Sequence, residues 1–257
     1  MISSRHNPRF RELVKLQSRK QRQQQGAFVA EGLRLVEDGL AAGWKPIELV
    51  VSPPMLSPET LARVREWDVP CLEVTPQLMA MASGTETPQG IMAVFSLPQH
   101  GPDALGGDLV LILDGIRDPG NAGTLLRSAA AVAAGGVLAL RGTVDLSAPK
   151  VVRASMGGIF RVPWVQGLEA RDAVRWAQDA GFRLLGLEPR GGVPFHRCDY
   201  SGKIALVVGG EAHGVNPELR QACAGILTIP MPGGQESLNA AMAATLVLYQ
   251  ARIYKGL

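Results

Sequence analysis

Three polar segments in the second half of the chain carry residue types that could perform chemistry. In the first, residues 114–127 (DGIRDPGNAGTLLR), Asn121 can cap a helix, and Arg127 follows about 9 Å further along its axis. Arg127 falls beside an apolar stripe and has no partner nearby in the sequence. It is therefore a functional arginine, or one that reaches the surface or bridges subunits.

The second segment, residues 207–217 (VVGGEAHGVNP), is rich in glycine. Gly209, Gly210 and Gly214 allow the backbone to approach a ligand closely or to adopt positive φ. Glu211 stands where a dinucleotide-binding fingerprint requires its second glycine, and the segment lacks the lysine of a phosphate-binding P-loop. By itself such a segment most commonly forms a tight turn.

The third segment, residues 229–244 (IPMPGGQESLNAAMAA), leads into the last expected helix. Ser237 can cap this helix, which places Asn239 in its first turn. Four small residues follow that allow very close packing: Ala240, Ala241, Ala243 and Ala244. Alone they are equally consistent with ordinary helix–helix packing.

The pattern of apolar residues predicts the elements that position these segments. The first part alternates helices and strands, as in a small α/β domain, with helices at 27–43, 58–67 and 76–82 and strands at 47–51, 71–74 and 90–97. After a stretch with two prolines and three glycines (98–108), stronger strands are expected at 109–113, 137–140, 183–187, 204–208 and 226–229. These alternate with helices at 121–134, 170–180, 217–222 and 237–253.

Apolar strands that alternate with helices predict an open parallel sheet, with ligands at the carboxyl ends of its strands. We therefore expect domains at 1–98 and 108–257, joined by a linker at 99–107. The hydrophobic content of 46% and charged content of 19% are those of a folded protein. The longest uncharged apolar stretch, 129–140, is shorter than the ~18 residues that span a membrane.

The amino terminus has no hydrophobic signal core, so the expected location is cytoplasmic. Three scattered cysteines and four scattered histidines indicate neither a metal site nor a disulfide framework. The net charge of +3 conceals a basic segment: residues 1–25 sum to +6 and the remainder to −3. Its cations are candidates for RNA binding through phosphate, or else form a solvated helix face: Arg5, Arg9, Arg11, Lys15, Arg19, Lys20 and Arg22.

Together, in order and spacing, the three segments resemble the signature motifs of the SpoU family of RNA 2′-O-ribose methyltransferases, in the SPOUT superfamily. Asn121 and Arg127 match the first motif, and residues 209–214 match G-x-E-x-x-G with Glu211 as its acid. Residues 229–231 (IPM) and 237–239 (SLN) match the third. Residues 153–157 (RASMG) and 160–163 (FRVP) are also similar to the family.

The amino-terminal part resembles, more weakly, the family's L30e-like substrate-binding domain. The similarity lies in residues 4–8 (SRHNP), 28–34 (FVAEGLR) and 87–91 (TPQGI). It implies that the basic segment contacts RNA. For residues 108–257 the family resemblance implies a trefoil knot, in which the chain after the third motif threads through an earlier loop. A threaded segment needs slim side chains, which would account for the alanines.

The resemblance also implies S-adenosylmethionine as cofactor, bound within the knot. By match, the cofactor-binding residues are Gly209, Gly210, Glu211, Gly214, Ile229, Met231, Ser237 and Leu238. The catalytic set is Arg127, Asn121, Glu211, Ser237 and Asn239. Family enzymes are homodimers with the site at the subunit interface, so an arginine of the partner can contribute; Arg117 and Arg153 are the candidates.

The family often gives the arginine that matches Arg127 the role of base. A guanidinium has a pKa above ~12 and normally stays protonated. Two accounts are open: a desolvated site could depress that pKa, or Arg127 stays charged and holds the adjacent RNA phosphate beside the developing oxyanion. Asn121, Ser237 and Asn239 would position the reactants, and Glu211 would orient the site.

The function that these residues imply is methyl transfer from S-adenosylmethionine to a ribose 2′-hydroxyl of structured RNA. Ribosomal RNA of the 23S type is favoured, by analogy, because a separate L30e-like domain usually accompanies ribosomal targets. The alternatives are a tRNA 2′-O-methyltransferase and a catalytically silent RNA-binding protein of the same fold. An oxidoreductase on a doubly wound sheet is disfavoured, since its fingerprint is missing.

Overall fold

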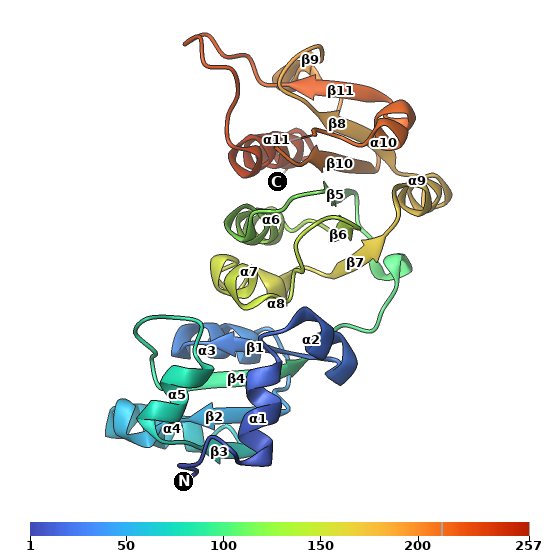
Figure 1. The fold of residues 1–257 in the computed structure, drawn as a ribbon. Coiled ribbons are helices and arrows are strands. Elements are labelled where there is room, and N and C mark those ends of the chain that lie inside the picture. Colours follow the sequence, from blue (N-terminus) through green and yellow to red (C-terminus); the bar gives the residue numbers. More distant parts are fainter. Residues whose placement is uncertain (212, 257) are drawn as a thin grey trace. The chain divides into compact units, whose positions relative to one another are not determined.

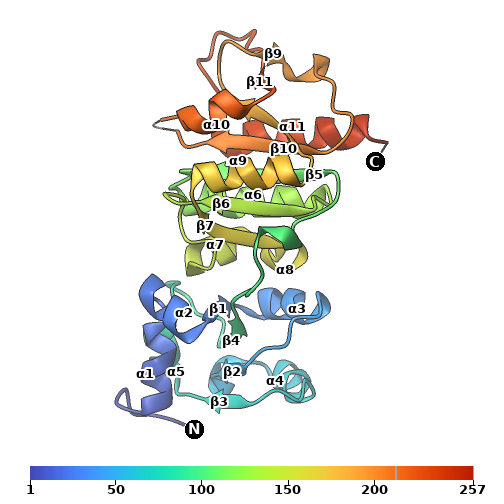
Figure 2. The same ribbon diagram turned by 90° about the vertical axis from the view of Figure 1, so that its right-hand side faces the viewer.

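The computed structural model describes residues 1–211 and 213–256, which form two units (Figures 1 and 2). The first unit comprises Met1–Leu97 and Ser147–Phe160, and the second comprises Pro98–Leu146 and Arg161–Leu257. Ala212, inside the glycine-rich segment, and Leu257 lie outside the described residues. In the described part of the chain, no helix combines the length and apolar character needed to cross a membrane.

The first unit is built on a four-stranded sheet in the order β1-β4-β2-β3. Its strands are β1 (Ala27–Glu31), β2 (Glu48–Val51), β3 (Cys71–Glu73) and β4 (Ile91–Ser96). Strand β4 is antiparallel to both neighbours, and β2 is parallel to β3. Its helices are α1 (Pro8–Lys15), α2 (Arg19–Gln25), α3 (Leu33–Ala41), α4 (Pro58–Arg65) and α5 (Pro76–Ala82).

The single helix predicted over residues 27–43 is wrong in its first third. Residues 27–30 are all buried and pair with β4, whereas a surface helix buries only one stripe. Gly32 then adopts φ +102° before α3 begins, a conformation that side-chain-bearing residues rarely adopt. The apolar residues at 27–30 were thus those of a buried strand, which periodicity alone does not separate from a helix.

The basic segment folds into α1 and α2, and one of its cations is buried. The Arg22 side chain donates to the carbonyl oxygens of Leu16 and Gln17, at 2.8 and 2.9 Å, and to Ser147. Arg22 is 2% exposed. Its assignment as an RNA contact is therefore wrong, because a buried guanidinium that caps backbone carbonyls cannot reach a phosphate without local unfolding.

The segment Ser147–Phe160, which the sequence places inside the second domain, packs within the first unit. It contains α7 (Pro149–Ala154) and most of α8 (Gly158–Arg161). The indole N–H of Trp44 donates to the Phe160 carbonyl at 2.9 Å. The Phe160 ring also lies 4.9 Å from that of Phe95, as part of an aromatic cluster that helps to hold the segment in place.

The second unit holds a seven-stranded parallel sheet in the order β7-β6-β5-β10-β8-β11-β9. Its strands are β5 (Leu109–Asp114), β6 (Gly136–Leu140), β7 (Trp164–Leu168), β8 (Arg183–Leu187), β9 (Val193–Pro194), β10 (Ile204–Gly209) and β11 (Gly225–Thr228). The predicted parallel sheet is confirmed; β7 and the short β9 had not been predicted. The β7 sequence (WVQGL) includes a glutamine and a glycine, and β9 has only two residues, so neither gives the continuous apolar run of a buried strand.

Helices cover both faces of this sheet. Figures 1 and 2 show α6 (Pro119–Ala131) and α11 (Ala240–Tyr254) on one face, with α9 (Ala170–Asp179) and α10 (Pro217–Ala222) on the other. Strands β5 and β10 are buried along almost their whole length, as expected between two helical layers. The loops at the carboxyl ends of the strands are therefore where a ligand can enter.

Candidate active site

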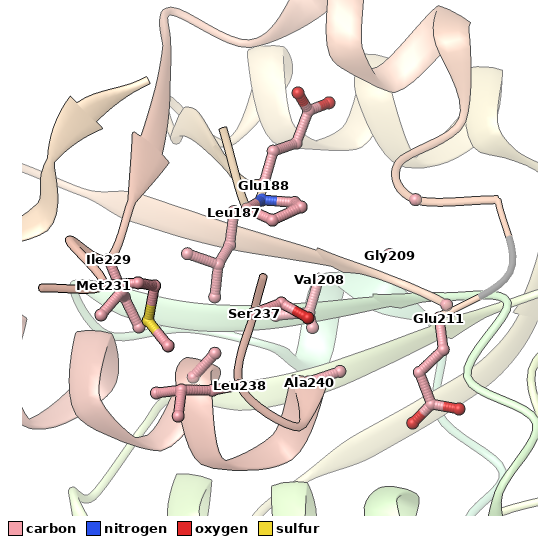
Figure 3. Close-up of a pocket in the computed structure, with 14 residues that line it drawn as sticks. Leu187, Glu188, Val208, Gly209, Glu211, Ile229, Met231, Ser237, Leu238 and Ala240 are labelled. Atoms are coloured by element: carbon pink, nitrogen blue, oxygen red, sulfur yellow. The ribbon is translucent and has the colours of Figure 1, made fainter. Parts of the chain in front are cut away.

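One cavity, of about 240 Å³, gathers residues from the second and third sequence segments. It lies at the carboxyl ends of β8, β10 and β11, against the beginning of α11. All eight residues expected to bind the cofactor line it: Gly209, Gly210, Glu211, Gly214, Ile229, Met231, Ser237 and Leu238. In Figure 3, apolar side chains gather on one side of the view, with the Ser237 hydroxyl and the Glu211 carboxylate on the other.

Six further residues of this lining were missed by sequence reasoning: Leu187, Glu188, Pro189, Val208, Ala240 and Ala243. Three of them follow or end β8, a strand that the sequence did predict. A signal was available, because ligands of open α/β sheets bind outside the carboxyl ends of strands. What the sequence could not give was the placement of β8 between β10 and β11.

The glycine-rich loop folds back tightly on itself. The Gly214 N–H donates to the Gly210 carbonyl at 2.8 Å, and the Gly210 N–H donates to the Asp114 carbonyl at 2.8 Å. A Cβ on Gly209 would overlap the backbone of Gly214, and one on Gly210 would overlap the carbonyl of Gly115. Two of the glycines are thus required by close contact between loops, and Gly214 by its φ of +64°.

Two predicted helix caps are wrong by a few residues. Helix α6 is capped by Asp118, whose carboxylate accepts the backbone N–H of Asn121 at 2.7 Å. Helix α11 is capped by Asn239, which accepts the N–H groups of Ala241 and Met242, whereas Ser237 lines the cavity. Asp118 and Asn239 are residue types favoured at helix N-caps, as Asn121 and Ser237 are, so residue type alone did not identify the cap.

The capping correction leaves the Asn121 side chain free to join a hydrogen-bonded chain. Its amide nitrogen donates to the Glu211 carboxylate, and its amide oxygen accepts from the Asn239 amide at 2.9 Å. One residue of each sequence segment takes part. The chain fixes which end of the Asn121 amide is donor and which is acceptor, and so presents a defined polar surface beside the cavity.

Arg127 stands apart from that chain. It is exposed, and it makes no hydrogen bond or ion pair with any residue that the structure describes. Six positions beyond Asn121 on α6, it is rotated by about 240° around the helix. The structure thus brings Glu211 and Ser237 to the cavity wall and links Asn121 and Asn239 to Glu211 by hydrogen bonds, whereas Arg127 takes no part.

Comparison with known proteins matches this arrangement to a family. Residues 108–249 match the SpoU rRNA Methylase family, and residues 7–93 match an MRM3-like substrate binding domain. The chain belongs to the SpoU rRNA methylase family. The resemblance read from the three motifs is therefore confirmed.

Relatives of this SpoU chain are similar over its whole length. It is 31% identical to the 23S rRNA (guanosine(2553)-2′-O)-methyltransferase RlmP of Bacillus subtilis, over 98% of each chain. It superposes on the SpoU methyltransferase AviRb of Streptomyces viridochromogenes, solved with the cofactor AdoMet, with a TM-score of 0.90, 29% identity and coverage of 97% and 98%. The superposition on an AdoMet-bound rRNA methyltransferase of Sinorhizobium meliloti has a TM-score of 0.85 and 32% identity, and covers 98% of this chain and 97% of that one.

The cavity of this SpoU chain fits S-adenosylmethionine chemically. Its apolar wall of Leu187, Ile229 and Leu238 suits an adenine ring, and backbone groups at three strand ends can satisfy polar edges. Glu188 and Glu211 supply the negative charge that suits a sulfonium. Among the described residues, no three His, Cys, Asp or Glu side chains are grouped so that they could hold a metal ion.

The two arginines expected to cross between SpoU subunits differ in availability. Arg153 is already engaged within the first unit: it donates to the Gly84 carbonyl at 3.0 Å and pairs with Glu31 at 3.4 Å. These contacts hold α7 in its own unit, and a role for Arg153 across a subunit interface stays a prediction. Arg117 is exposed and lies in the loop after β5.

The other cations of the basic segment are exposed. Arg9 pairs with Glu48, and Lys15 pairs with Glu12 at 2.6 Å. Both pairs are open to solvent, where such contacts contribute only about 0–1 kcal/mol and exchange readily for a phosphate. The cations of the basic segment that stay accessible in this SpoU chain are Arg5, Arg9, Arg11, Lys15, Arg19 and Lys20.

Near the cavity, one carboxyl of the SpoU unit has a shifted pKa. Burial raises the pKa of Asp114, at the end of β5, while the Asn216 N–H that it accepts at 2.5 Å lowers it. This hydrogen bond ties the loop after β10 to the end of β5. Asp114 therefore helps to hold the site's two central loops together.

Proposed function

We propose that this chain transfers the methyl group of S-adenosylmethionine to a ribose 2′-hydroxyl of ribosomal RNA. One observation carries the proposal: the eight motif residues line one cavity, and the Asn239–Asn121–Glu211 chain ends in its wall at Glu211. Family membership and the AdoMet-bound structural relatives support the cofactor.

When bound, S-adenosylmethionine supplies an electrophilic methyl carbon on a sulfonium. In the transfer, the ribose 2′-oxygen would take that methyl group, sulfur would keep the electron pair of the broken bond, and the 2′-hydroxyl proton would pass to water. The chain's own task is alignment. Glu211 holds the Asn121 amide, which together with Asn239 presents fixed hydrogen-bonding groups at the wall where the ribose must lie.

For Arg127 we propose the charged role rather than that of a base. The described residues leave the Arg127 side chain exposed, so they do not provide the burial that the role of base requires. A charged guanidinium binds a phosphate oxygen pair in bidentate fashion. Arg127 thus holds the RNA phosphate next to the target ribose and stabilises the developing oxyanion.

Ribosomal RNA is the proposed substrate because RlmP, similar over 98% of each chain, is named for 23S rRNA. The match of residues 7–93 to a substrate binding domain supports RNA recognition by the first unit. Its exposed cations Arg5, Arg11, Arg19 and Lys20 supply the phosphate contacts. The cytoplasm, where ribosomes are made, is the proposed location.

We further propose a homodimer through the second unit, with the chain knotted as the family resemblance implies. Helix α11 exposes large apolar side chains at positions three or four apart, which places them along one side of the helix. They are Met242, Leu246, Tyr249 and Ile253, between 43% and 59% exposed. A second copy of this chain, seated on this stripe, removes it from water.

The proposal is tested by mapping 2′-O-methyl groups, nucleotide by nucleotide, in rRNA and tRNA of cells with and without the gene. Loss of one methyl from rRNA is the expected result. Loss from tRNA alone would move the substrate to the alternative class. An unchanged map, with cofactor binding intact, would support a silent RNA-binding protein instead.

The role of Arg127 is tested with Arg127→Ala. We expect the purified variant to bind S-adenosylmethionine as the wild type does, because Arg127 does not line the cavity. Methyl transfer to rRNA should fall by about 10²-fold or more, as when a charge-stabilising donor is removed. Calorimetry measures the binding of S-adenosylmethionine, and an assay with tritiated methyl groups measures the transfer. Full activity of the variant would contradict the role proposed for Arg127.

A further inference from the structure

A second cavity, of about 360 Å³, adjoins the cofactor pocket. Three loops of the second unit form it: the loop after β5, the loop after β6 and the loop after β10. Gly210, Glu211 and Gly214 line both cavities. The remaining lining consists of Asp114, Gly115, Arg117, Arg141, Gly142, His213, Asn216 and Pro217.

The topology of the sheet explains why a crevice opens here. Strands β5 and β10 are neighbours, but the chain leaves β5 toward α6 on one face and leaves β10 toward α10 on the other (Figures 1 and 2). Loops that diverge to opposite faces leave a gap at the carboxyl ends of their strands, which is where open α/β sheets bind ligands.

The free hydrogen-bonding groups of this crevice are mainly cationic donors. Arg117 makes no hydrogen bond or ion pair within the described part of the chain. Arg141, whose side chain is 74% exposed, pairs with Glu169 at 2.8 Å and with no other described residue, and this pair is open to solvent. The two carboxylates of the wall are already bonded, Asp114 to the Asn216 N–H and Glu211 to Asn121.

We propose that this crevice binds an RNA phosphodiester adjoining the methylated ribose, on the opposite side of the ribose from the phosphate assigned to Arg127, with Arg117 and Arg141 as its ligands. Two guanidinium groups from neighbouring loops match the oxygens of one phosphate group. The ribose then lies against Gly210 and Glu211, which separate this crevice from the cofactor pocket. The inference rests on the proposed function and adds two residues that position its substrate.

The test compares Arg117→Ala, Arg141→Ala and the double variant with Arg175→Ala, an exposed arginine on α9 of the same unit. The substrate is rRNA purified from cells that lack the gene. We expect the KM for RNA to rise about tenfold for each single variant. The salt slope of RNA binding should fall by about one per arginine. The affinity for S-adenosylmethionine should not change.

Arg117→Lys keeps the charge without the bidentate geometry, so its KM should lie between those of wild type and Arg117→Ala. If KM and salt slope of the Arg117 and Arg141 variants equal those of Arg175→Ala, the inference is wrong. If the wild type itself transfers no methyl group to rRNA, the proposed function fails and the inference falls with it. The two failures are thus distinguishable.

Mixed dimers test whether Arg117 serves its own subunit. One subunit carries Arg117→Ala and the other Asn121→Ala, so that no subunit retains both residues. If Arg117 acts in the crevice of its own chain, the mixed dimer stays as impaired as its parents. Recovery of about half the wild-type activity would show that Arg117 reaches the partner's site instead, and would overturn the assignment.

Discussion

At the scale of single residues, Gly209 and Gly210 illustrate how a motif can be required for a reason other than ligand contact. A Cβ on either residue would overlap backbone of the neighbouring turn or of the loop after β5, so both close the loop on itself. The carboxylate of Glu211 can meet Asn121 only because this loop is closed. The two glycines thus shape the site by allowing close backbone contacts, not through side chains of their own.

Gly210→Ala should therefore open the loop. We expect a loss of about 1–3 kcal/mol in the free energy of unfolding, as for overpacking, and a cofactor affinity at least tenfold weaker. Gly233→Ala is the matched control, because a Cβ there meets nothing within 4 Å. Chemical denaturation and calorimetry measure both. Equal behaviour of the two variants would contradict the close-contact explanation.

At the scale of elements, the beginning of α11 couples helix stability to the site. Asn239 uses its amide oxygen to cap the helix, through Ala241 and Met242, and its amide nitrogen to hold Asn121. The Asn239 side chain thus has two roles, capping the helix and holding Asn121, which a substitution can separate. A carboxylate in its place keeps the capping acceptor but removes the donor.

Asn239→Asp should separate the two roles. Its free energy of unfolding should stay near that of wild type, whereas Asn239→Ala should lose about 1 kcal/mol through the missing cap. Both variants should transfer methyl groups about 10²-fold more slowly, because Asn121 loses the Asn239 donor and is held by Glu211 alone. Thermal unfolding and a methyl-transfer assay test this; an Asn239→Asp variant of normal activity would show that the amide donor is dispensable.

At the scale of the whole molecule, the exposed apolar stripe of α11 is the feature that a single chain leaves unsatisfied. The same helix covers one face of the sheet with Ala244, Val247 and Leu248, while Met242, Leu246 and Tyr249 face outward. A helix that is apolar on two sides is covered on both. A second subunit is the occupant that we propose for the outer side.

Leu246→Glu should therefore weaken the dimer, because it places a charge within the apolar contact. We expect sedimentation to shift toward the monomer, and methyl transfer to fall in proportion if the site needs both subunits. Gln178→Glu introduces the same charge on α9 and should leave the dimer intact. A Leu246→Glu protein that sediments with the wild type would place the interface elsewhere.

The sequence by itself determined the family, the parallel sheet and eight of the fourteen residues that line the cavity. The three motifs are local, and each lies in a loop after a strand or before a helix. Residues that are close in the sequence of such a loop stay close together in the folded protein. Strands such as β5 and β10 were predictable because both faces are buried. The buried strand at 27–30 was not, since a short apolar run is equally consistent with a helix.

Only the tertiary structure decided which polar groups meet and which cations are available. Arg22 and Arg153 looked like free arginines, yet each makes a contact with a residue more than a hundred positions away, Ser147 and Glu31 respectively. Asn121 and Asn239, 118 positions apart, meet because α6 and α11 share one face of the sheet. Such contacts depend on strand order, which sequence periodicity does not encode.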